Sequence, residues 1–339
     1  MFSFALSLLP TVLSSGWTLN NLDLSVYPDA RCLDGSPGAY YVLAGDDRFV
    51  LHLQGGGWCT SMENCANRAR FPVYPGQPSI GSTSAWADPA GGPCTAALSH
   101  TAPPCGSDGG SGGLFSSNAT VNPLFSTATK VWIGYCSGDG FSGTRVGPQA
   151  VNASASVYFS GAFILDAVLR ELLTKHGMAR ASAVLLKGCS VGGASTFSHA
   201  DYVGAVVKAG TGGAARFAAL PGAGFLLDVA PFSGPNNFRA WSQWVYETMG
   251  ANASCNTACV QAYEAQRPGS GWQCFIPRYS LPFVSTPLFV ANSAADSAQA
   301  GYLALGCNPA SGDCNAAQLA YLDSFRVRAR TRPLFPPPA

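Results

Sequence analysis

The sequence predicts an α/β fold with a mostly parallel central sheet flanked by helices, and three observations support this. Residues 49–53 and 183–186 are almost entirely apolar, as is typical of parallel strands buried on both faces. Residues 157–176 carry apolar side chains at helical spacing and lead into the second of these strands, which gives a strand–helix–strand unit. A chain of 339 residues can bury a large core, so we expect one domain over residues 17–332.

The composition excludes several classes of function. Charged residues make up 11% of the chain and the formal net charge is +1, so we expect no nucleic-acid partner. The 12 cysteines indicate an oxidising compartment. They do not form the paired C-x-x-C sets with histidines that hold zinc, so we expect no metal and no cofactor.

The N-terminus predicts secretion. Residues 1–13 are apolar and small residues follow as far as Gly16, as in a signal peptide. This segment is too short to cross a bilayer, and no other stretch approaches the ~18 apolar residues of a membrane helix. Sequons at Asn118, Asn152 and Asn252 agree with an extracellular glycoprotein. We therefore expect no transmembrane anchor, whereas the sequence leaves the oligomeric state open.

The first strands lead into a run of glycines. Turn chemistry precedes the strand expected at residues 39–43, and a second strand follows at residues 49–53. This second strand runs directly into Gly55, Gly56 and Gly57. Three glycines after a buried strand fit an oxyanion loop, in which bare backbone amides approach a substrate carbonyl. A merely flexible loop is the alternative.

Residues 72–113 form a long surface excursion, rich in glycine, proline, serine and alanine and without an apolar period. We expect Cys94 and Cys105 to pin it. It forms a lid or a wall of the cleft, or is simply tolerated length. Two further cysteine pairs are close enough in sequence to bond locally: Cys59 with Cys65, and Cys307 with Cys314.

A polar loop follows the next predicted strand. Residues 129–136 read as a buried strand and end in the glycine-rich segment 137–143. Because open α/β sheets bind ligands at the carboxyl ends of their strands, Asp139 is a candidate substrate contact. An ordinary Asp-Gly turn is the alternative.

The most specific motif lies at residues 188–192. Gly-Cys-Ser-Val-Gly follows an apolar strand and fits the G-x-S-x-G nucleophile elbow. A serine on such a tight strand-to-helix turn takes strained backbone angles, so the positions two before and two after it must lack side chains. The turn lifts the Ser190 hydroxyl clear of the sheet and aims the Val191 N–H at the charge that develops in acyl transfer. A glycine loop early in the chain and this elbow later are in the order of an α/β hydrolase.

The remaining elements follow the same alternation. Residues 218–228 read as a strand and a loop, residues 287–292 as the last clear strand, and Asp296 follows it by a few residues. A helix is expected at residues 317–330. The ending at residues 333–339 is proline-rich and is expected to form a disordered tail.

With these residues in view, the chain resembles the pectin acetylesterase and Notum carboxylesterase family over about residues 20–330. The resemblance depends on an ordered series of short signatures. They are Cys32-Leu33-Asp34-Gly35-Ser36-Pro37, Leu51-His52-Leu53-Gln54-Gly55-Gly56-Gly57-Trp58-Cys59, Tyr135-Cys136, Gly188-Cys189-Ser190-Val191-Gly192-Gly193, Ala223-Gly224-Phe225-Leu226-Leu227-Asp228 and the strand that leads to Asp296.

The resemblance implies an α/β-hydrolase-like, metal-free serine esterase. Ser190 would be the nucleophile and Asp296 the triad acid, with an oxyanion hole formed by the backbone N–H groups of Gly57, Trp58 and Val191. Other aspartates also follow the elbow, and each could be either the triad acid or an aspartate without a catalytic role: Asp201, Asp228, Asp313 and Asp323. Plant and microbial members remove acetyl groups from pectin, so an acetylated cell-wall polysaccharide is the implied substrate and the cell wall the implied location.

Three features depart from the family pattern. Gln54 stands where many relatives have an acidic residue, and the excursion at residues 72–113 is long. A base must take the proton of the serine, and in the order Ser–Asp–His the histidine should follow Asp296. The four histidines all precede Asp296: His52, His100, His176 and His199. The triad histidine is therefore not found, and we expect a C-terminally truncated chain with impaired base catalysis.

Two other functions fit the same sequence. A lipid-ester deacylase of the Notum type would need a deep apolar pocket for a fatty acyl group. A glycan-binding pseudoenzyme without activity would account for the missing histidine.

Overall fold

The structure is a computed structural model that describes residues 16–72, 79–86, 113–294, 296, 299, 305–307 and 312–331, with side chains of the last helix as far as residue 325. Several predictions fall outside these residues. They concern the signal peptide before Gly16, most of the 72–113 excursion with Cys94, His100 and Cys105, and the tail at residues 333–339.

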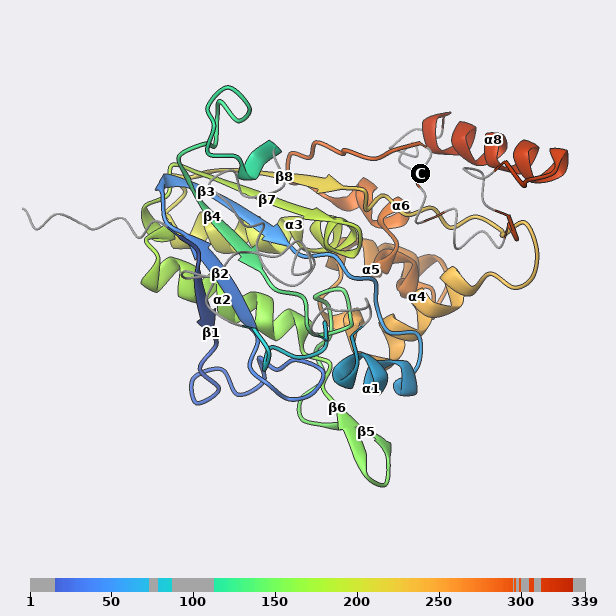
Figure 1. Ribbon diagram of the computed structural model, residues 1–339, viewed down its shortest axis with the longest axis horizontal. Coiled ribbons are helices and arrows are strands. Elements are labelled where there is room, and N and C mark those ends of the chain that lie inside the picture. The colour runs from blue at the N-terminus through green and yellow to red at the C-terminus, as the bar shows by residue number, and fades with distance from the viewer. Residues whose placement is uncertain are drawn as a thin grey trace, which may run out of the picture.

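A six-stranded mixed sheet forms the centre of the molecule, in the order β1-β2-β4-β3-β7-β8 (Figure 1). The four strands β4, β3, β7 and β8 are parallel, whereas β1 and β2 join antiparallel at one edge. This confirms the predicted α/β class. The strands are β1 Thr18–Asn21, β2 Ala39–Leu43, β3 Asp46–Leu53, β4 Ala128–Ile133, β7 Ala183–Cys189 and β8 Arg216–Gly222, and a separate hairpin is formed by β5 Gln149–Asn152 and β6 Ala155–Val157.

The strand expected at residues 287–292 meets the sheet only at isolated points. Leu288 bridges to Ala219 and Ala291 bridges to Gly222, both in parallel orientation. The segment therefore runs along β8 at the edge of the sheet without forming a continuous strand. Its bridges still bring the following residues, including Asp296, toward the carboxyl end of β8.

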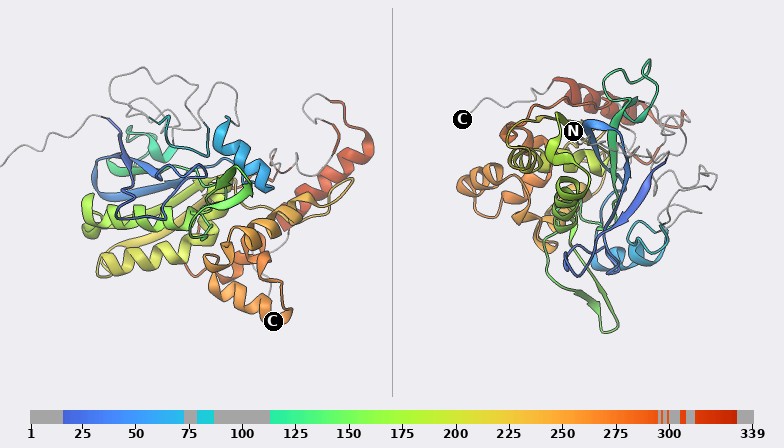
Figure 2. Two further views of the ribbon diagram at one scale, coloured as in Figure 1. Left: turned by 90° about the horizontal axis from the view of Figure 1, so that it is seen from below. Right: turned by 90° about the vertical axis from the view of Figure 1, so that its left-hand side faces the viewer.

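Two long helices cover one face of the sheet. Helix α2 spans Gly161–Lys175 and α3 spans Val191–Gly210, and both lie on the same side of the strands (Figure 2). The shared core contains Leu51, Leu186 and Val184 of the sheet together with Leu165 and Val168 of α2. The predicted helix at residues 157–176 is thus confirmed as the crossover between β4 and β7.

The other face of the central strands carries a second, aromatic cluster. Its buried residues are Trp17, Tyr41, Val50, Phe115, Ala128 and Trp132. Because β3 and β4 contribute to both clusters, their apolar side chains are buried on both faces, as the continuous apolar runs predict.

Helices α4, α5 and α6 gather beyond the carboxyl ends of β7 and β8 (Figure 1). The bounds of the remaining helices are α1 Met62–Arg70, α4 Asn237–Thr248, α5 Thr257–Gln266, α6 Pro277–Ser280 and α8 Ala316–Thr331, with 3-10 turns at η2 Gly113–Phe115, η3 Met178–Arg180, η4 Ala251–Ala253, η5 Gly271–Phe275 and η6 Leu281–Phe283. Among the described residues, no helix is long and apolar enough to span a membrane.

Disulfides tie the loops to this frame. The bonded pairs among the described residues are Cys32–Cys136, Cys59–Cys65, Cys259–Cys274 and Cys307–Cys314. Two of these are the local pairs predicted from sequence. Cys189 and Cys255 have free thiols.

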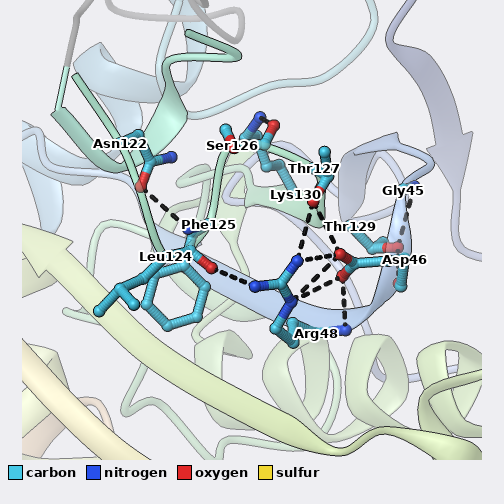
Figure 3. Close-up of polar contacts among 10 residues, drawn as sticks. All are labelled: Gly45, Asp46, Arg48, Asn122, Leu124, Phe125, Ser126, Thr127, Thr129 and Lys130. Carbon is cyan, nitrogen blue, oxygen red and sulfur yellow. Dashed lines mark hydrogen bonds and ion pairs between the residues drawn. The ribbon is translucent and has the colours of Figure 1, made fainter. Parts of the chain in front are cut away.

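A polar network fixes the amino-terminal end of β3. The Arg48 guanidinium bonds the Asp46 carboxylate, the carbonyl oxygen of Leu124 at 2.6 Å and the hydroxyl of Thr127 at 2.8 Å (Figure 3). Hydrogen bonding from Arg48 is the main reason why the pKa of Asp46 falls to about 2. The network closes the end of the parallel sheet opposite to the loops that follow β3 and β7.

Candidate active site

Ser190 lies on the sharp junction between β7 and α3. Its backbone has φ 58° and ψ −127°, which places a non-glycine residue in a strained region, and the residue is exposed. A Cβ at Gly188 would lie 2.1 Å from the carbonyl oxygen of Gly192, and one at Gly192 would lie 2.0 Å from that of Leu53. Side chains are therefore excluded at both positions, as the elbow motif predicts.

The amide of Val191 opens a helix of 20 residues. The first N–H groups of a helix have no partner within it, and the helix dipole gives that end a partial positive charge. Val191 directly follows Ser190, so an anion formed beside the serine hydroxyl would lie close to this end of α3.

The glycine loop after β3 lies directly against the elbow. A Cβ at Gly55 would lie 2.6 Å from the carbonyl oxygen of Cys189 and 3.1 Å from the Cβ of Ser190. Gly56 and Gly57 have φ values of 150° and 66°, which favour glycine. The structure thus brings together two segments that are 135 residues apart, from Gly55 to Ser190.

The side chain of Trp58 faces the protein interior. Its ring lies 5.9 Å from that of Phe238 and 5.8 Å from that of Phe275, measured between ring centroids. The next residue is also anchored, because the N–H of Cys59 donates to the carbonyl oxygen of Gly138 at 2.8 Å. These contacts hold the far end of the glycine loop in place.

Gln54 joins the carboxyl ends of β3 and β4. Its Oε1 accepts a hydrogen bond from the N–H of Tyr135 at 2.9 Å, and its backbone N–H donates to Ile133 at 3.2 Å. An amide oxygen serves here as the acceptor, so the interaction does not require an acidic side chain. The Nε2 of Gln54 is buried and has no hydrogen-bond partner among the described residues.

Asp139 has a structural role in place of the substrate contact proposed from sequence. It is completely buried, and its carboxylate accepts hydrogen bonds from the hydroxyl of Ser137 at 2.6 Å and from the N–H groups of Gly161 and Ser142 at 2.9 and 3.3 Å. Burial raises its pKa to about 6. Asp139 thus joins the loop at residues 137–143 to the start of α2, which the sequence pattern does not reveal.

Asp296 is buried and connects to the segment after β8. The backbone N–H and the Nε2 of Gln299 donate to its two carboxylate oxygens at 3.1 and 3.0 Å. Gln299 also accepts from the N–H of Leu227 at 2.8 Å and donates to the carbonyl oxygen of Phe225 at 3.2 Å. The neighbouring Gly224 packs on the start of α3, since a Cβ there would lie 2.3 Å from the N of Ala194.

Two of the alternative aspartates have structural partners. Asp201 accepts hydrogen bonds from the backbone N–H groups of Ser285 and Thr286. Asp228 receives the Arg239 guanidinium at 2.7 Å and the Tyr279 hydroxyl at 2.8 Å, and so holds α4 and α6 together. The other two, Asp313 and Asp323, are exposed in the C-terminal part of the chain.

The three described histidines are all engaged away from the elbow. His52 packs on Trp132 in the aromatic cluster with ring centroids 4.4 Å apart, and burial keeps its pKa well below the usual value. His176 contacts the Tyr40 hydroxyl at 3.0 Å. The Nε2 of His199 lies 3.1 Å from the Ser142 hydroxyl, and burial lowers its pKa to about 4. His52 and His199 are thus buried core histidines, and His176 is half-buried.

A cavity of about 740 Å³ lies between α2, α3 and the start of α5. Ser190 does not line it, whereas His199, Cys255 and Phe283 do.

A family model of pectinacetylesterases matches residues 14–99 and 107–332. Pectin acetylesterase 7 of Arabidopsis thaliana is 26% identical over 320 residues, which cover 90% of this chain and 72% of the relative. Pectin acetylesterase 4 of the same plant is 30% identical over 322 residues, covering 88% and 67%.

The animal relatives are matched over a smaller part of their own length. The palmitoleoyl-protein carboxylesterase Notum of Homo sapiens is 27% identical over 295 residues, covering 82% of this chain but only 51% of the relative. The solved structure of the Wnt deacylase Notum from Drosophila superposes with a TM-score of 0.76 at 22% identity, and covers 93% of this chain and 81% of that one. The chain therefore shares this fold and spans about half the length of the human relative.

The burial of Asp139 leads to a testable pH dependence. Because its pKa is about 6 in the folded protein, above the ordinary 3.8, the folded state binds this proton more tightly than the unfolded chain. Below about pH 4 the carboxyl is protonated in both states and costs no stability. As the pH rises from about 4 through 6, ionisation of Asp139 is favoured in the unfolded chain and the fold is progressively destabilised. We expect the free energy of unfolding of the wild type, relative to Asp139→Asn, to fall by up to ~3 kcal/mol across this range. Denaturant titrations at pH 4 and pH 7 measure it, and a difference that does not vary with pH contradicts the assignment.

Proposed function

The chain belongs to the pectinacetylesterase family, and we propose that it is a secreted serine carboxylic-ester hydrolase whose nucleophile is Ser190. The observation that carries the proposal is the close contact between the glycine loop at Gly55 and the elbow at Ser190. An exposed serine on a strained turn, a helix N-terminus beside it and a glycine loop against it are the parts that acyl transfer requires.

In the proposed mechanism, the Ser190 oxygen attacks the carbonyl carbon of the ester while a base removes its proton. The carbonyl oxygen becomes an oxyanion, which the backbone N–H groups of Gly57, Trp58 and Val191 would stabilise. The tetrahedral intermediate then expels the alcohol and leaves an acyl-serine. Water activated by the same base attacks this ester and releases the carboxylic acid.

Asp296 is the proposed acid of the triad, where it would orient an imidazole and stabilise the imidazolium. Its attachment through Gln299 to the segment that packs on α3 supports this choice, whereas the carboxylates of Asp201 and Asp228 are held by structural partners elsewhere. We assign the base to none of the described histidines, because His52, His176 and His199 are held by contacts elsewhere.

We propose an acetylated polysaccharide of the cell wall, such as pectin, as the substrate. The plant relatives named pectin acetylesterases and the family match support this choice. The four disulfides among the described residues support secretion, since such bonds persist in oxidising compartments. Neither a metal nor a cofactor enters the proposed reaction.

The similarity to Notum supports a second candidate, the removal of a longer acyl group. Such a reaction needs an apolar pocket beside the nucleophile, and the cavity lined by His199, Cys255 and Phe283 does not supply it because Ser190 lies outside its lining. Deacetylation remains the preferred proposal because the family model that matches the chain is that of the pectinacetylesterases. The third candidate is a glycan-binding protein without activity, which would neither release acetate nor react with a serine-directed probe.

Replacement of the nucleophile tests the reaction directly. We expect Ser190→Ala to lower acetate release from acetylated pectin at least ~100-fold and to abolish labelling by a fluorophosphonate probe, because both require the serine oxygen. The control is Cys189→Ser, which changes the adjacent exposed thiol and should retain activity and labelling. Equal acetate release by Ser190→Ala and wild type would remove Ser190 from the mechanism. A wild-type protein that neither releases acetate nor reacts with the fluorophosphonate probe would support the glycan-binding protein without activity.

The length of the acyl group separates the two esterase candidates. We expect hydrolysis of p-nitrophenyl esters to fall steeply from acetyl to octanoyl, as the proposed preference for the small acetyl group requires. The measurement is kcat/KM for the acetyl, butyryl and octanoyl esters. A rise in kcat/KM with chain length would support the lipid deacylase instead.

A further inference from the structure

We propose that Arg68 is a positioning residue that holds the Gly56–Gly57 peptide in the orientation needed for the oxyanion hole. Arg68 lies on α1, and its Nη1 donates a hydrogen bond to the carbonyl oxygen of Gly56 at 2.9 Å. Its Nη2 would lie 3.3 Å from a Cβ placed on Gly57. The guanidinium therefore lies alongside this one peptide unit. The inference rests on the proposed function and extends it to a residue outside the triad and its amides.

The geometry of the peptide gives this bond its significance. The carbonyl of Gly56 and the N–H of Gly57 belong to one planar trans unit and point in opposite directions. When Arg68 fixes the carbonyl oxygen on one side, it directs the Gly57 N–H to the other side.

Glycine on both sides makes this peptide easy to rotate. Gly56 and Gly57 both have positive φ, and without a Cβ the chain can adopt several other conformations at similar energy. A rotation by half a turn would present a carbonyl oxygen where the oxyanion needs a donor. The loop therefore needs a constraint from elsewhere, and the hydrogen bond from Arg68 is one.

The position of Arg68 is itself fixed. Helix α1 begins at the cap Ser61, whose hydroxyl accepts from the N–H of Asn64 at 3.1 Å, and the disulfide Cys59–Cys65 joins the helix to the end of the glycine loop. The carbonyl oxygen of Arg68 accepts a hydrogen bond from the hydroxyl of Ser79. The loop and the residue that braces it thus form one short, cross-linked stretch of chain.

The charge of Arg68 adds to its geometric role. The side chain is half-buried, and its Nε is buried with no hydrogen-bond partner among the described residues. A cation bonded to the Gly56 carbonyl polarises the peptide and makes the Gly57 N–H a better donor. The charge of Arg68 also acts on Tyr135. Burial and the nearby Asp139 raise the pKa of the Tyr135 hydroxyl, whereas Arg68 lowers it. The ring of that tyrosine contacts Gly56, since a Cβ there would lie 3.0 Å from its Cδ1.

The test uses the full chain and p-nitrophenyl acetate as the probe. We expect Arg68→Ala to lower kcat by about 10- to 100-fold with little change in KM, because the lost stabilisation belongs to the transition state. Millimolar guanidinium should restore part of the lost rate, and Arg68→Lys should retain more activity than Arg68→Ala. The matched control is Arg70→Ala, an exposed arginine at the end of the same helix.

The outcomes separate this inference from the proposed function. If Ser190→Ala abolishes hydrolysis but Arg68→Ala keeps the wild-type kcat, the role of Arg68 is overturned and the esterase proposal stands. If Ser190→Ala hydrolyses the ester as fast as the wild type, both proposals fail. If kcat falls together with the thermal midpoint in both Arg68 variants, and guanidinium restores nothing, Arg68 supports only the fold and the inference is overturned.

Discussion

The candidate active site depends on one close approach of two backbones, that of the glycine loop after β3 and that of the elbow after β7. Cβ atoms at Gly55, Gly188 or Gly192 would come within 2.0–2.6 Å of a neighbouring backbone oxygen. Only glycine, which has no Cβ, tolerates such a distance. The loop and the elbow can therefore pack together only if these three positions are glycine. The serine gains its exposure, and the loop its position, from this packing.

The sheet order explains why these two loops meet. Strands β3 and β7 are adjacent and parallel, and Leu53 pairs with Gly188 at their carboxyl ends. The residues that follow each strand therefore emerge side by side at one edge of the sheet, where open α/β sheets bind their ligands. The loop at residues 137–143 emerges from the next strand, β4, and its contacts with Cys59 and α2 stabilise the glycine loop from the other side.

Local patterns predicted β2, β3, β4, β7 and β8, the elbow and the glycine loop, because these features depend on apolar runs and sterics within a few residues, but they gave no sign of β1 or of the hairpin β5–β6. Long-range packing decided the rest. Asp139 looked like a ligand because it follows a strand, but its burial depends on α2, which begins some 20 residues later. Arg68 gave no signal, since an arginine on a short exposed helix is ordinary until its contact with Gly56 is known. The edge segment at residues 287–292 was predicted as a strand from its composition, yet only Leu288 and Ala291 bridge to β8.

The most direct test of the central claim is a crystal structure of the protein after reaction with a fluorophosphonate. The account predicts phosphorus bonded to the Ser190 oxygen, with the phosphoryl oxygen about 2.7–3.1 Å from the N atoms of Gly57 and Val191. A phosphoryl oxygen turned to solvent, or an adduct on another residue, would contradict the pairing of the glycine loop with the elbow.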